Sequence, residues 1–362
     1  MAADVGDDGA RRVPAARLVT PDPMEAPTLS TRPLLAAARS ERPGVGATEV
    51  AQRVIANVER VVYGRRAAVE LVACGLLAGG HVLLQDVPGS GKTTIARAFA
   101  RSVGGTFRRI QATADLLPGD ITGSSVWEPD RRGFAFVPGP LFAHVVLVDE
   151  LNRATPRAQS ALLEAMDEGA ATVDGVRHPL PDPFFLVATQ NPLDQHGTYP
   201  LPEGQLDRFA VALRLGDNDA VTERRVVREQ LRRATVDDLA PVLVPDELRA
   251  AQAMVRDTHI ADAVLDYAVN VVRATRAHPG VRVGASSRAA LALARCAQAR
   301  AVVLGREYVL PDDVKQLAPF ALGHRLVLHR THQQHSGADS FGAGAAVVAE
   351  AMAGVVVPVR RD

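Results

Sequence analysis

Residues 81–103 hold the pattern that most restricts how this chain can fold. A short apolar run, HVLLQ at 81–85, is followed by the glycine-rich loop DVPGSGKT and then by TTIARAFARSV at 93–103, which has helical periodicity. The loop matches the phosphate-binding pattern G-x-x-x-x-G-K-[ST] at every defined position except the first, where Asp86 replaces glycine. This strand, loop and helix predict an α/β fold in which free N–H groups at a helix start bind a nucleoside triphosphate.

Individual loop residues can be given roles in that site. Lys92 reaches the β- and γ-phosphates, and the Thr93 hydroxyl can ligate Mg²⁺. A carboxylate near phosphates is unfavourable unless it points away, so we expect replacement of Asp86 by glycine to leave nucleotide binding equal or tighter. The predicted nucleotide-binding residues are Asp86, Val87, Pro88, Gly89, Ser90, Gly91, Lys92, Thr93 and Thr94.

A second apolar run, VVLVD at 145–149, ends in two acids. Asp149, at the strand end, can hold the shell of a magnesium ion, and the adjacent Glu150 can polarise a water for attack on the γ-phosphate. Paired acids after a strand are often only a solvated turn. Because these two follow a phosphate-binding loop, we interpret Asp149 as a metal residue and Glu150 as catalytic.

Short apolar runs alternate with helical patterns as far as Gly216. The runs lie at 81–85, 107–111, 145–149, 184–190 and 211–215, and they predict a parallel sheet covered by helices on both faces. Turn residues within 125–139 and 171–183 predict two inserted β-hairpins. Beyond Gly216 only helical patterns remain. We expect a disordered tail at 1–45, an α/β core at 46–216, an all-helical domain at 217–335, and a C-terminal helix and tail at 336–362.

Composition argues against several classes of protein. Forty-one basic and forty-one acidic residues leave no net charge, which disfavours a general binder of nucleic acid or anionic membranes. No apolar run approaches the ~18 residues of a membrane span, so we expect a cytoplasmic protein with no membrane span. The two cysteines, Cys74 and Cys296, lie in apolar helical patterns and indicate buried, reduced thiols.

Several separated stretches resemble the MoxR family of AAA+ ATPases across roughly residues 47–358. They are GGHVLLQDVPGSGKT, DLLPGDITGSSV, PGPLFAHVVLVDELNRATPRAQSALLEAMDE, TVDGVRHPLPDPFFLVATQNP, GTYPLPEGQLDRF and GASSRA. The resemblance implies a five-stranded parallel sheet with hairpin insertions and a helical lid, and an enzyme that hydrolyses ATP with Mg²⁺. It also implies a homo-oligomer, a hexameric ring, that remodels or matures a client protein, often with a partner that carries a von Willebrand factor A domain.

The same resemblance implies roles for three residues outside the loop. Asn191 matches the sensor-1 residue that orients the attacking water. Arg208, in QLDRF, matches the arginine finger that reaches the γ-phosphate held by a neighbouring subunit, and Arg288, in GASSRA, matches the sensor-2 arginine of the lid. Ser287 stands where the family commonly has proline, and we expect it to cap the helix that carries Arg288.

Two other classes of function stay open from the sequence. An ATP-driven nucleic-acid remodeller is disfavoured because the second hairpin offers only Arg177 and His178 as basic residues, and the first balances its two arginines with acids. A nucleotide-gated scaffold without useful turnover is disfavoured by the presence of Glu150, Asn191 and Arg208. Nucleic acid is therefore not expected as a partner.

Two further groups of residues invite a functional interpretation. Trp127 and Phe134, on the first predicted hairpin, are candidate anchors for a client protein, with packing onto the core as an equal alternative. A histidine cluster could suggest metal, but no cysteine lies nearby and the spacing shares one helix face only in part, so we favour a polar helix end. The four histidines are His324, His329, His332 and His335.

Overall fold

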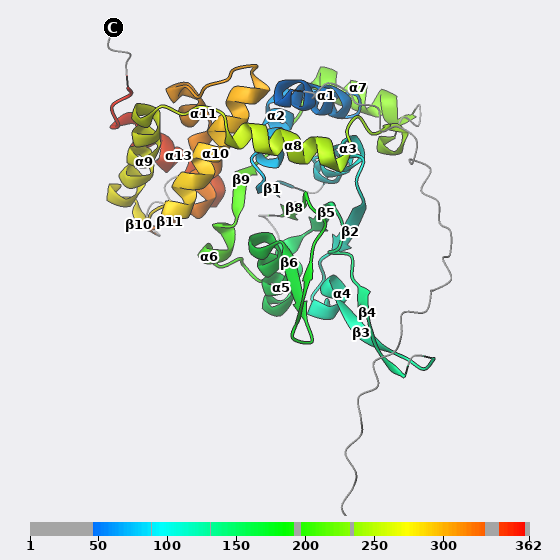
Figure 1. Cartoon of the computed structure of the whole chain (residues 1–362). Coiled ribbons are helices and arrows are strands. Elements are labelled where there is room, and N and C mark those ends of the chain that lie inside the picture. The colour runs from blue at the N-terminus through cyan, green and yellow to red at the C-terminus, as the bar shows by residue number, and fades with distance from the viewer. Residues whose placement is uncertain are drawn as a thin grey trace, which may run out of the picture. The chain divides into compact units, whose positions relative to one another are not determined.

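Five parallel strands form the central sheet of the computed structural model (Figure 1). In order across the sheet they are β2 (Phe107–Gln111), β5 (Val145–Asp149), β8 (Phe185–Gln190), β1 (His81–Gln85) and β9 (Phe209–Leu213). Because every neighbouring pair is parallel, the carboxyl ends of all five strands meet at one edge of the sheet and the amino ends at the other. The predicted fold class is confirmed.

The structure describes residues 46–87, 89–130, 132–191, 197–231, 235–329 and 340–358. These residues belong to one compact unit. The tail predicted at 1–45 lies outside them, and so do Pro88, Arg131, His332 and His335. Within the described ranges, no helix has both the length and the apolar character that crossing a bilayer requires.

Helices cover the sheet and continue beyond it. In chain order they are α1 (Ala47–Glu59), α2 (Arg66–Leu77), α3 (Lys92–Val103), α4 (Pro118–Thr122), α5 (Pro156–Glu168), α6 (Glu203–Leu206), α7 (Ala220–Leu231), α8 (Pro245–Arg256), α9 (Asp262–Ala277), α10 (Ser287–Val303), α11 (Pro311–Leu322) and α13 (Ser340–Ala353). Short 3₁₀ turns lie at Leu151–Arg153, Val236–Asp238 and Gly323–Arg325. We call α8, α9, α10 and α11 the lid helices.

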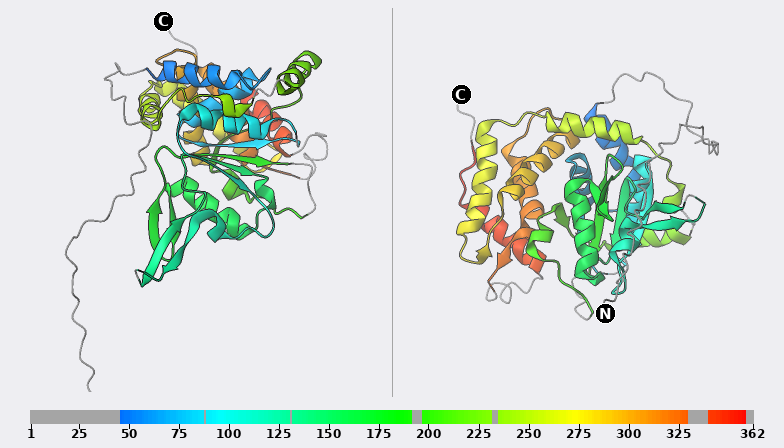
Figure 2. Two further views of the ribbon diagram at one scale, coloured as in Figure 1. Left: turned by 90° about the vertical axis from the view of Figure 1, so that its right-hand side faces the viewer. Right: turned by 60° about the horizontal axis from the view of Figure 1, so that its bottom comes forward.

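Alternating side chains of the strands divide the core between the two faces of the sheet. Val82 of β1 belongs to a buried cluster with Phe99 of α3, whereas its neighbour Leu83 belongs to a different cluster with Leu162 of α5. Successive side chains of a strand point to opposite faces, so a wholly apolar strand needs cover on both. Figure 2 shows helices on either side of the sheet.

Local sequence explains where two of the helices beside the sheet, α3 and α5, begin. α3 begins directly after Gly91, whose φ of 95° is a left-handed conformation that glycine adopts without strain. α5 begins after Thr155, whose hydroxyl accepts a hydrogen bond from the backbone N–H of Ala158, and it has Pro156 at its first position. The glycine loop was recognised in the sequence as a helix start, whereas the cap of α5 at Thr155 and Pro156 was not.

Two antiparallel hairpins extend from the core, as predicted. They are β3 (Gly123–Glu128) with β4 (Gly133–Pro138), and β6 (Ala170–Val173) with β7 (Val176–Pro179). The Phe136 ring of the first stacks on His178 of the second, with 3.8 Å between ring centroids. Both hairpins project from the sheet on the side away from α1 and α8 (Figure 1).

The lid helices share a continuous apolar core with α1 and α2. Leu76 of α2 and Leu293 of α10 belong to one buried cluster. Thr48 Oγ1 donates a hydrogen bond to the carbonyl oxygen of Val302 at 3.0 Å, and Gln252 Nε2 donates to the carbonyl oxygen of Leu76 at 2.8 Å. The domain boundary proposed at residue 216 therefore follows the change from strands to helices rather than a break in the core.

The region after residue 216 also contains a short antiparallel pair of strands that was not predicted from the sequence, β10 (Val281–Val283) with β11 (Val327–Leu328).

His324, just before β11, is buried, and its Nε2 bonds to the carbonyl oxygen of Phe209 at 3.0 Å. Burial lowers the pKa of His324 to about 3. His324 is therefore a core histidine, not part of a polar helix end. Among the described residues, no group of three or more His, Cys, Asp or Glu is placed to hold a metal ion.

Candidate functional site

The phosphate-binding loop joins the carboxyl end of β1 to the start of α3. Lys92 Nζ donates hydrogen bonds to the backbone oxygens of Asp86 and Val87, at 2.6 and 2.7 Å. Ser90 Oγ is buried and has no hydrogen-bond partner in the described part of the chain. Lys92 thus bonds to carbonyl oxygens of its own loop, and the buried hydroxyl of Ser90 is unsatisfied. Both side chains can donate hydrogen bonds to an anion.

The Asp86 carboxylate joins the start of the loop to the segment just after β9. Its Oδ1 accepts a hydrogen bond from the backbone N–H of Val87 at 2.8 Å, and its Oδ2 accepts from the N–H groups of Leu215 and Gly216 at 3.1 and 3.0 Å. These N–H groups offset the charge of the buried carboxylate. The carboxylate is therefore directed at backbone N–H groups, the orientation in which such a charge is tolerated near a phosphate-binding loop, and glycine could not make these bonds.

A cavity of about 310 Å³ at the carboxyl edge of the sheet brings two of the four predicted catalytic residues, Glu150 and Asn191, together with the predicted magnesium residues. It is lined by Gly89, Gly91, Lys92, Thr93 and Thr94 on the loop side, and by Arg109, Gln111, Asp149, Glu150, Thr189 and Asn191 on the strand side. Burial lowers the pKa of Lys92, and the carboxylates of Asp86, Asp149 and Glu150 oppose that effect. This edge is where open parallel sheets bind their ligands.

Asp149 and Thr93 form an oxygen pair suited to a divalent cation. Asp149 Oδ1 accepts hydrogen bonds from Thr189 Oγ1 at 3.2 Å and from Thr93 Oγ1 at 3.5 Å. A carboxylate and a hydroxyl beside a phosphate-binding loop are hard oxygen ligands of the kind that Mg²⁺ takes. The residues predicted to hold magnesium therefore fit that ion.

Glu150 has a φ of 58°, a left-handed conformation that is uncommon for a residue with a side chain. Its backbone N–H donates to Thr189 Oγ1 at 2.9 Å. Its Oε2 accepts from Gln111 Nε2 at 3.4 Å and lies 3.1 Å from Arg153 Nε. An unusual backbone held by such bonds marks a residue whose position matters. Asn191, one residue beyond β8, lines the same cavity.

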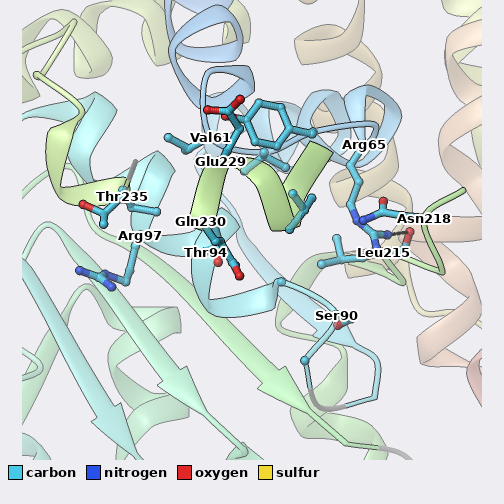
Figure 3. Close-up of a pocket in the computed structure, with 16 residues that line it drawn as sticks. Val61, Arg65, Ser90, Thr94, Arg97, Leu215, Asn218, Glu229, Gln230 and Thr235 are labelled. Atoms are coloured by element: carbon cyan, nitrogen blue, oxygen red, sulfur yellow. Dashed lines mark hydrogen bonds between the residues drawn. The ribbon is translucent and has the colours of Figure 1, made fainter. Parts of the chain in front are cut away.

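A second cavity, of about 350 Å³, also touches the loop (Figure 3). Its lining combines apolar and polar side chains, among them Val61, Val62, Tyr63, Arg65, Ser90, Leu215, Val226, Glu229 and Gln230. Gly89, Gly91 and Thr94 line both cavities. A partly apolar cavity that continues from a phosphate-binding loop fits the nucleoside part of a nucleotide. This cavity was not predicted from the sequence, and the apolar residues just before Tyr63 were the available signal.

Arg208 and Arg288 lie at the opposite edge of the sheet. Both pair with Asp167 in the last turn of α5, through Arg208 Nε at 2.9 Å and Arg288 Nη2 at 3.0 Å. The carbonyl oxygen of Met166 lies 3.2 Å from Nε2 of His81, the first residue of β1. Because the phosphate-binding loop follows the last residue of β1, the length of that strand separates the two arginines from the loop. Neither arginine lines the two cavities described above.

A third cavity, of about 350 Å³, contains the two arginines. Its charged lining residues are Asp167, Asp207, Arg208, Arg288, Arg295 and Arg325.

Ser286, not Ser287, caps α10, since the Ser286 hydroxyl accepts a hydrogen bond from the N–H of Ala289 at 3.2 Å. The expectation for Ser287 was wrong because the helix itself begins at that residue.

Two family models match the chain. The model described as "ATPase family associated with various cellular activities (AAA)" matches residues 81–211, from the start of β1 into β9. A model described as an AAA lid domain matches residues 273–341, which include α10 and α11. The two matches follow the order of sheet and lid helices seen in the structure.

Similar proteins span most of the chain. It is 45% identical over 310 residues to the uncharacterized protein YeaC of Bacillus subtilis (strain 168), covering 86% of this chain and 95% of that protein. It is 41% identical over 286 residues to Chaperone MoxR1 of Mycobacterium tuberculosis (strain ATCC 25618 / H37Rv), covering 76% and 75%. A crystal structure from Cytophaga hutchinsonii ATCC 33406, provisionally described as an ATPase, has a TM-score of 0.78 and 32% identity, covering 86% of this chain and 96% of that one. The chain therefore belongs to the MoxR family of AAA+ ATPases, enzymes that hydrolyse ATP.

Proposed function

We propose that this ATPase works in the cytoplasm as a homo-oligomeric ring, a hexamer, in which each ATP lies between two subunits and drives the remodelling or maturation of a client protein. The observation that carries the proposal is that the phosphate-binding residues and the two predicted catalytic arginines lie apart within one chain. Lys92 and Glu150 line a cavity at the carboxyl edge of the sheet, whereas Arg208 and Arg288 pair with Asp167 at the amino edge. A second copy of the chain can bring the two sets together.

In the proposed site, Lys92 and the N–H groups of the loop bind the β- and γ-phosphates of ATP. Thr93 and Asp149 hold Mg²⁺, which supplies neutralisation of the phosphate charge when it is bound. Glu150 accepts a proton from the attacking water, and Asn191 orients that water. The base and ribose occupy the partly apolar cavity that continues from the loop.

Arg208 and Arg288, in this proposal, act on ATP held by the neighbouring subunit. Charge that develops on the transferred phosphoryl group is stabilised by cations that are already fixed in place. The shared carboxylate of Asp167 fixes both guanidinium groups within 3.0 Å. Supplying these cations in trans makes hydrolysis depend on assembly.

We place the client-binding surface on the β3–β4 hairpin. Trp127 and Phe134 lie edge to face with 5.3 Å between ring centroids, and they are 50% and 74% exposed, so neither is buried against the core. Aromatic side chains contribute most to binding at protein interfaces. The relative MoxR1 is named a chaperone. The proposal includes a partner with a von Willebrand factor A domain, which the family resemblance implies. On the β6–β7 hairpin, Arg177 lies 3.8 Å from Glu168, which favours a protein client over nucleic acid.

The test of the proposed ring mixes two inactive variants. Arg208→Ala subunits bind ATP but fail to hydrolyse it, and Glu150→Gln subunits keep the arginine but lack the proton acceptor. In mixed rings, phosphate release returns at interfaces that pair an intact Glu150 with an intact Arg208. With random mixing of equal amounts, such interfaces are about a quarter of the total.

The matched control replaces the Glu150→Gln chain with a chain that carries both substitutions, which can assemble but offers no intact pair. Native mass spectrometry verifies that the two chains share rings. Recovery with the doubly substituted chain, or no recovery with Glu150→Gln in shared rings, would show that the trans cation lies elsewhere.

A further inference from the structure

Arg109 on β2 holds the carboxylate that the proposed function assigns to Mg²⁺. Its Nε lies 2.6 Å from Oδ2 of Asp149, while Oδ1 of the same carboxylate accepts hydrogen bonds from the hydroxyls of Thr189 and Thr93. Both carboxylate oxygens are therefore engaged. The Asp149 side chain is 7% exposed and the Arg109 side chain 52% exposed, so a cation reaches this buried anion from the solvent side.

Strand register explains how Arg109 reaches the site. In the β2–β5 ladder Arg109 is paired with Leu147, two residues before Asp149, and its long side chain extends forward along the sheet. The guanidinium also donates from Nη2 to Gln111 Oε1 at 3.2 Å. Gln111 Nε2 in turn donates to Glu150 Oε2 at 3.4 Å. Arg109 is thus linked to both acids of the cavity.

We propose that Arg109 is a positioning residue that competes with Mg²⁺ for Asp149 and releases the carboxylate when Mg²⁺ and ATP bind. The inference rests on the proposed use of Mg²⁺ by Thr93 and Asp149. A buried carboxylate without a counter-charge is unfavourable, so the site needs a cation before the metal arrives. Two cations beside one carboxylate repel each other, and the half-exposed Arg109 can leave toward solvent at small cost.

The test measures how binding of a fluorescent, non-hydrolysable ATP analogue to the full chain depends on free Mg²⁺. If Arg109 competes with the ion, Arg109→Gln lowers the half-saturating Mg²⁺ concentration by about fivefold, the size expected for a partly exposed ion pair. Arg109→Lys keeps a charge but not the planar fork, so it lowers this concentration by less. We call this half-saturating concentration the Mg²⁺ midpoint. If Arg109 had a purely structural role, its substitution would leave the Mg²⁺ midpoint unchanged.

Arg108→Gln is the matched control, because Arg108 is the preceding arginine on β2 and its side chain points to the opposite face. It is expected to leave the Mg²⁺ midpoint unchanged. Thermal unfolding first verifies that both variants are folded. The inference would be overturned if Arg109→Gln and Arg109→Lys both have an Mg²⁺ midpoint equal to or higher than that of the unsubstituted chain. If Arg109→Gln does not fold, the result for Arg109→Lys alone decides. If the unsubstituted chain binds the analogue equally with and without Mg²⁺, the proposed use of the metal fails too, which separates the two failures.

Discussion

Lys92 and Arg208 stand at opposite edges of one parallel sheet. Lys92 opens α3 just past the carboxyl end of β1, and Arg208 directly precedes Phe209, which pairs with His81 at the amino end of β1. For the proposed site, this geometry means that one chain carries the phosphate-binding half on one edge and the cationic half on the other. In that site, ATP hydrolysis requires the assembly of at least two chains.

Lys92→Ala is expected to abolish nucleotide binding, because the loop loses the cation that reaches the β- and γ-phosphates. Titration calorimetry with ATP measures this directly. Lys315 on α11 is the other lysine of the chain, and Lys315→Ala serves as the matched control with unchanged affinity. Unchanged affinity in Lys92→Ala would remove the assignment of the phosphate-binding loop.

Asp86→Ala is expected to lower the free energy of unfolding by about 3 kcal/mol, because the N–H groups of Val87, Leu215 and Gly216 lose their buried acceptor. Asp86→Asn keeps one acceptor oxygen and should lose less. Urea unfolding at neutral pH compares the three chains. Equal stability of Asp86→Ala and the unsubstituted chain would show that these bonds contribute nothing. Asp86→Gly should suffer the same loss, so its nucleotide affinity has to be measured under conditions where it is folded.

Asp167→Asn is expected to lower kcat about tenfold with little change in KM, because the carboxylate that fixes Arg208 and Arg288 loses its charge. Steady-state phosphate release measures both constants. Asp246→Asn, which removes an exposed partner of Arg249 on α8, is the control and should retain the parent values. A rise in KM with unchanged kcat would mean that Asp167 acts on nucleotide binding instead.

His81 is expected to make the fold less stable in acid. The N–H of Leu186 donates to its Nδ1 at 3.1 Å, which requires an unprotonated nitrogen, and burial lowers the pKa of His81 from 6.5 to about 4. The unfolded chain takes up a proton near pH 6.5 while the folded chain does not, so this stability is present above pH 6.5 and is lost as the pH falls toward 4.

Between pH 7 and pH 5 the loss from His81 is about 2 kcal/mol in the free energy of unfolding. The matched variant is His81→Asn, whose amide oxygen can accept the same hydrogen bond and does not titrate. The stability difference between the two chains should therefore shrink by that amount over this range. A difference that stays constant with pH would contradict the argument.

Trp127→Ala and Phe134→Ala are expected to reduce the capture of client protein without changing ATP hydrolysis, because the two exposed rings lie on the β3–β4 hairpin rather than at the nucleotide cavities. Co-purification of partners with the Glu150→Gln chain supplies the readout. Val176→Ala, an exposed apolar position on the neighbouring hairpin, is the control. Capture that survives both substitutions would move the client surface elsewhere, and tight, salt-sensitive DNA binding would favour a nucleic-acid substrate.

The parts of the site that were predicted from sequence are those formed by contiguous residues at strand ends. Lys92 and Thr93 follow one apolar strand, and Asp149 and Glu150 follow another. In a parallel sheet such ends meet at one edge, and the structure indeed places these four residues on one cavity. The local sequence pattern, together with the rule that parallel strands end at the same edge of a sheet, was therefore enough to predict that these residues lie together.

The parts that were missed depend on register and packing. Arg109 reaches Asp149 because β2 pairs with β5 in one particular register. Two of the three backbone partners of the Asp86 carboxylate, Leu215 and Gly216, lie just beyond β9, more than a hundred positions later in the chain. The second cavity joins residues around Tyr63 to residues of α7. No local periodicity contains such pairings, because they exist only once distant segments have packed.

The shared core of α1, α2 and the lid helices also determines how the chain loses its structure. Since Leu76 and Leu293 lie in one buried cluster, neither region can open without exposing apolar surface of the other. Heating should then melt both in a single cooperative transition. A nucleotide that touches only the loop and its two cavities should raise the midpoint of that whole transition, by an amount that grows with RT ln(1 + [L]/Kd), and should slow amide exchange in α10 as well as in α3.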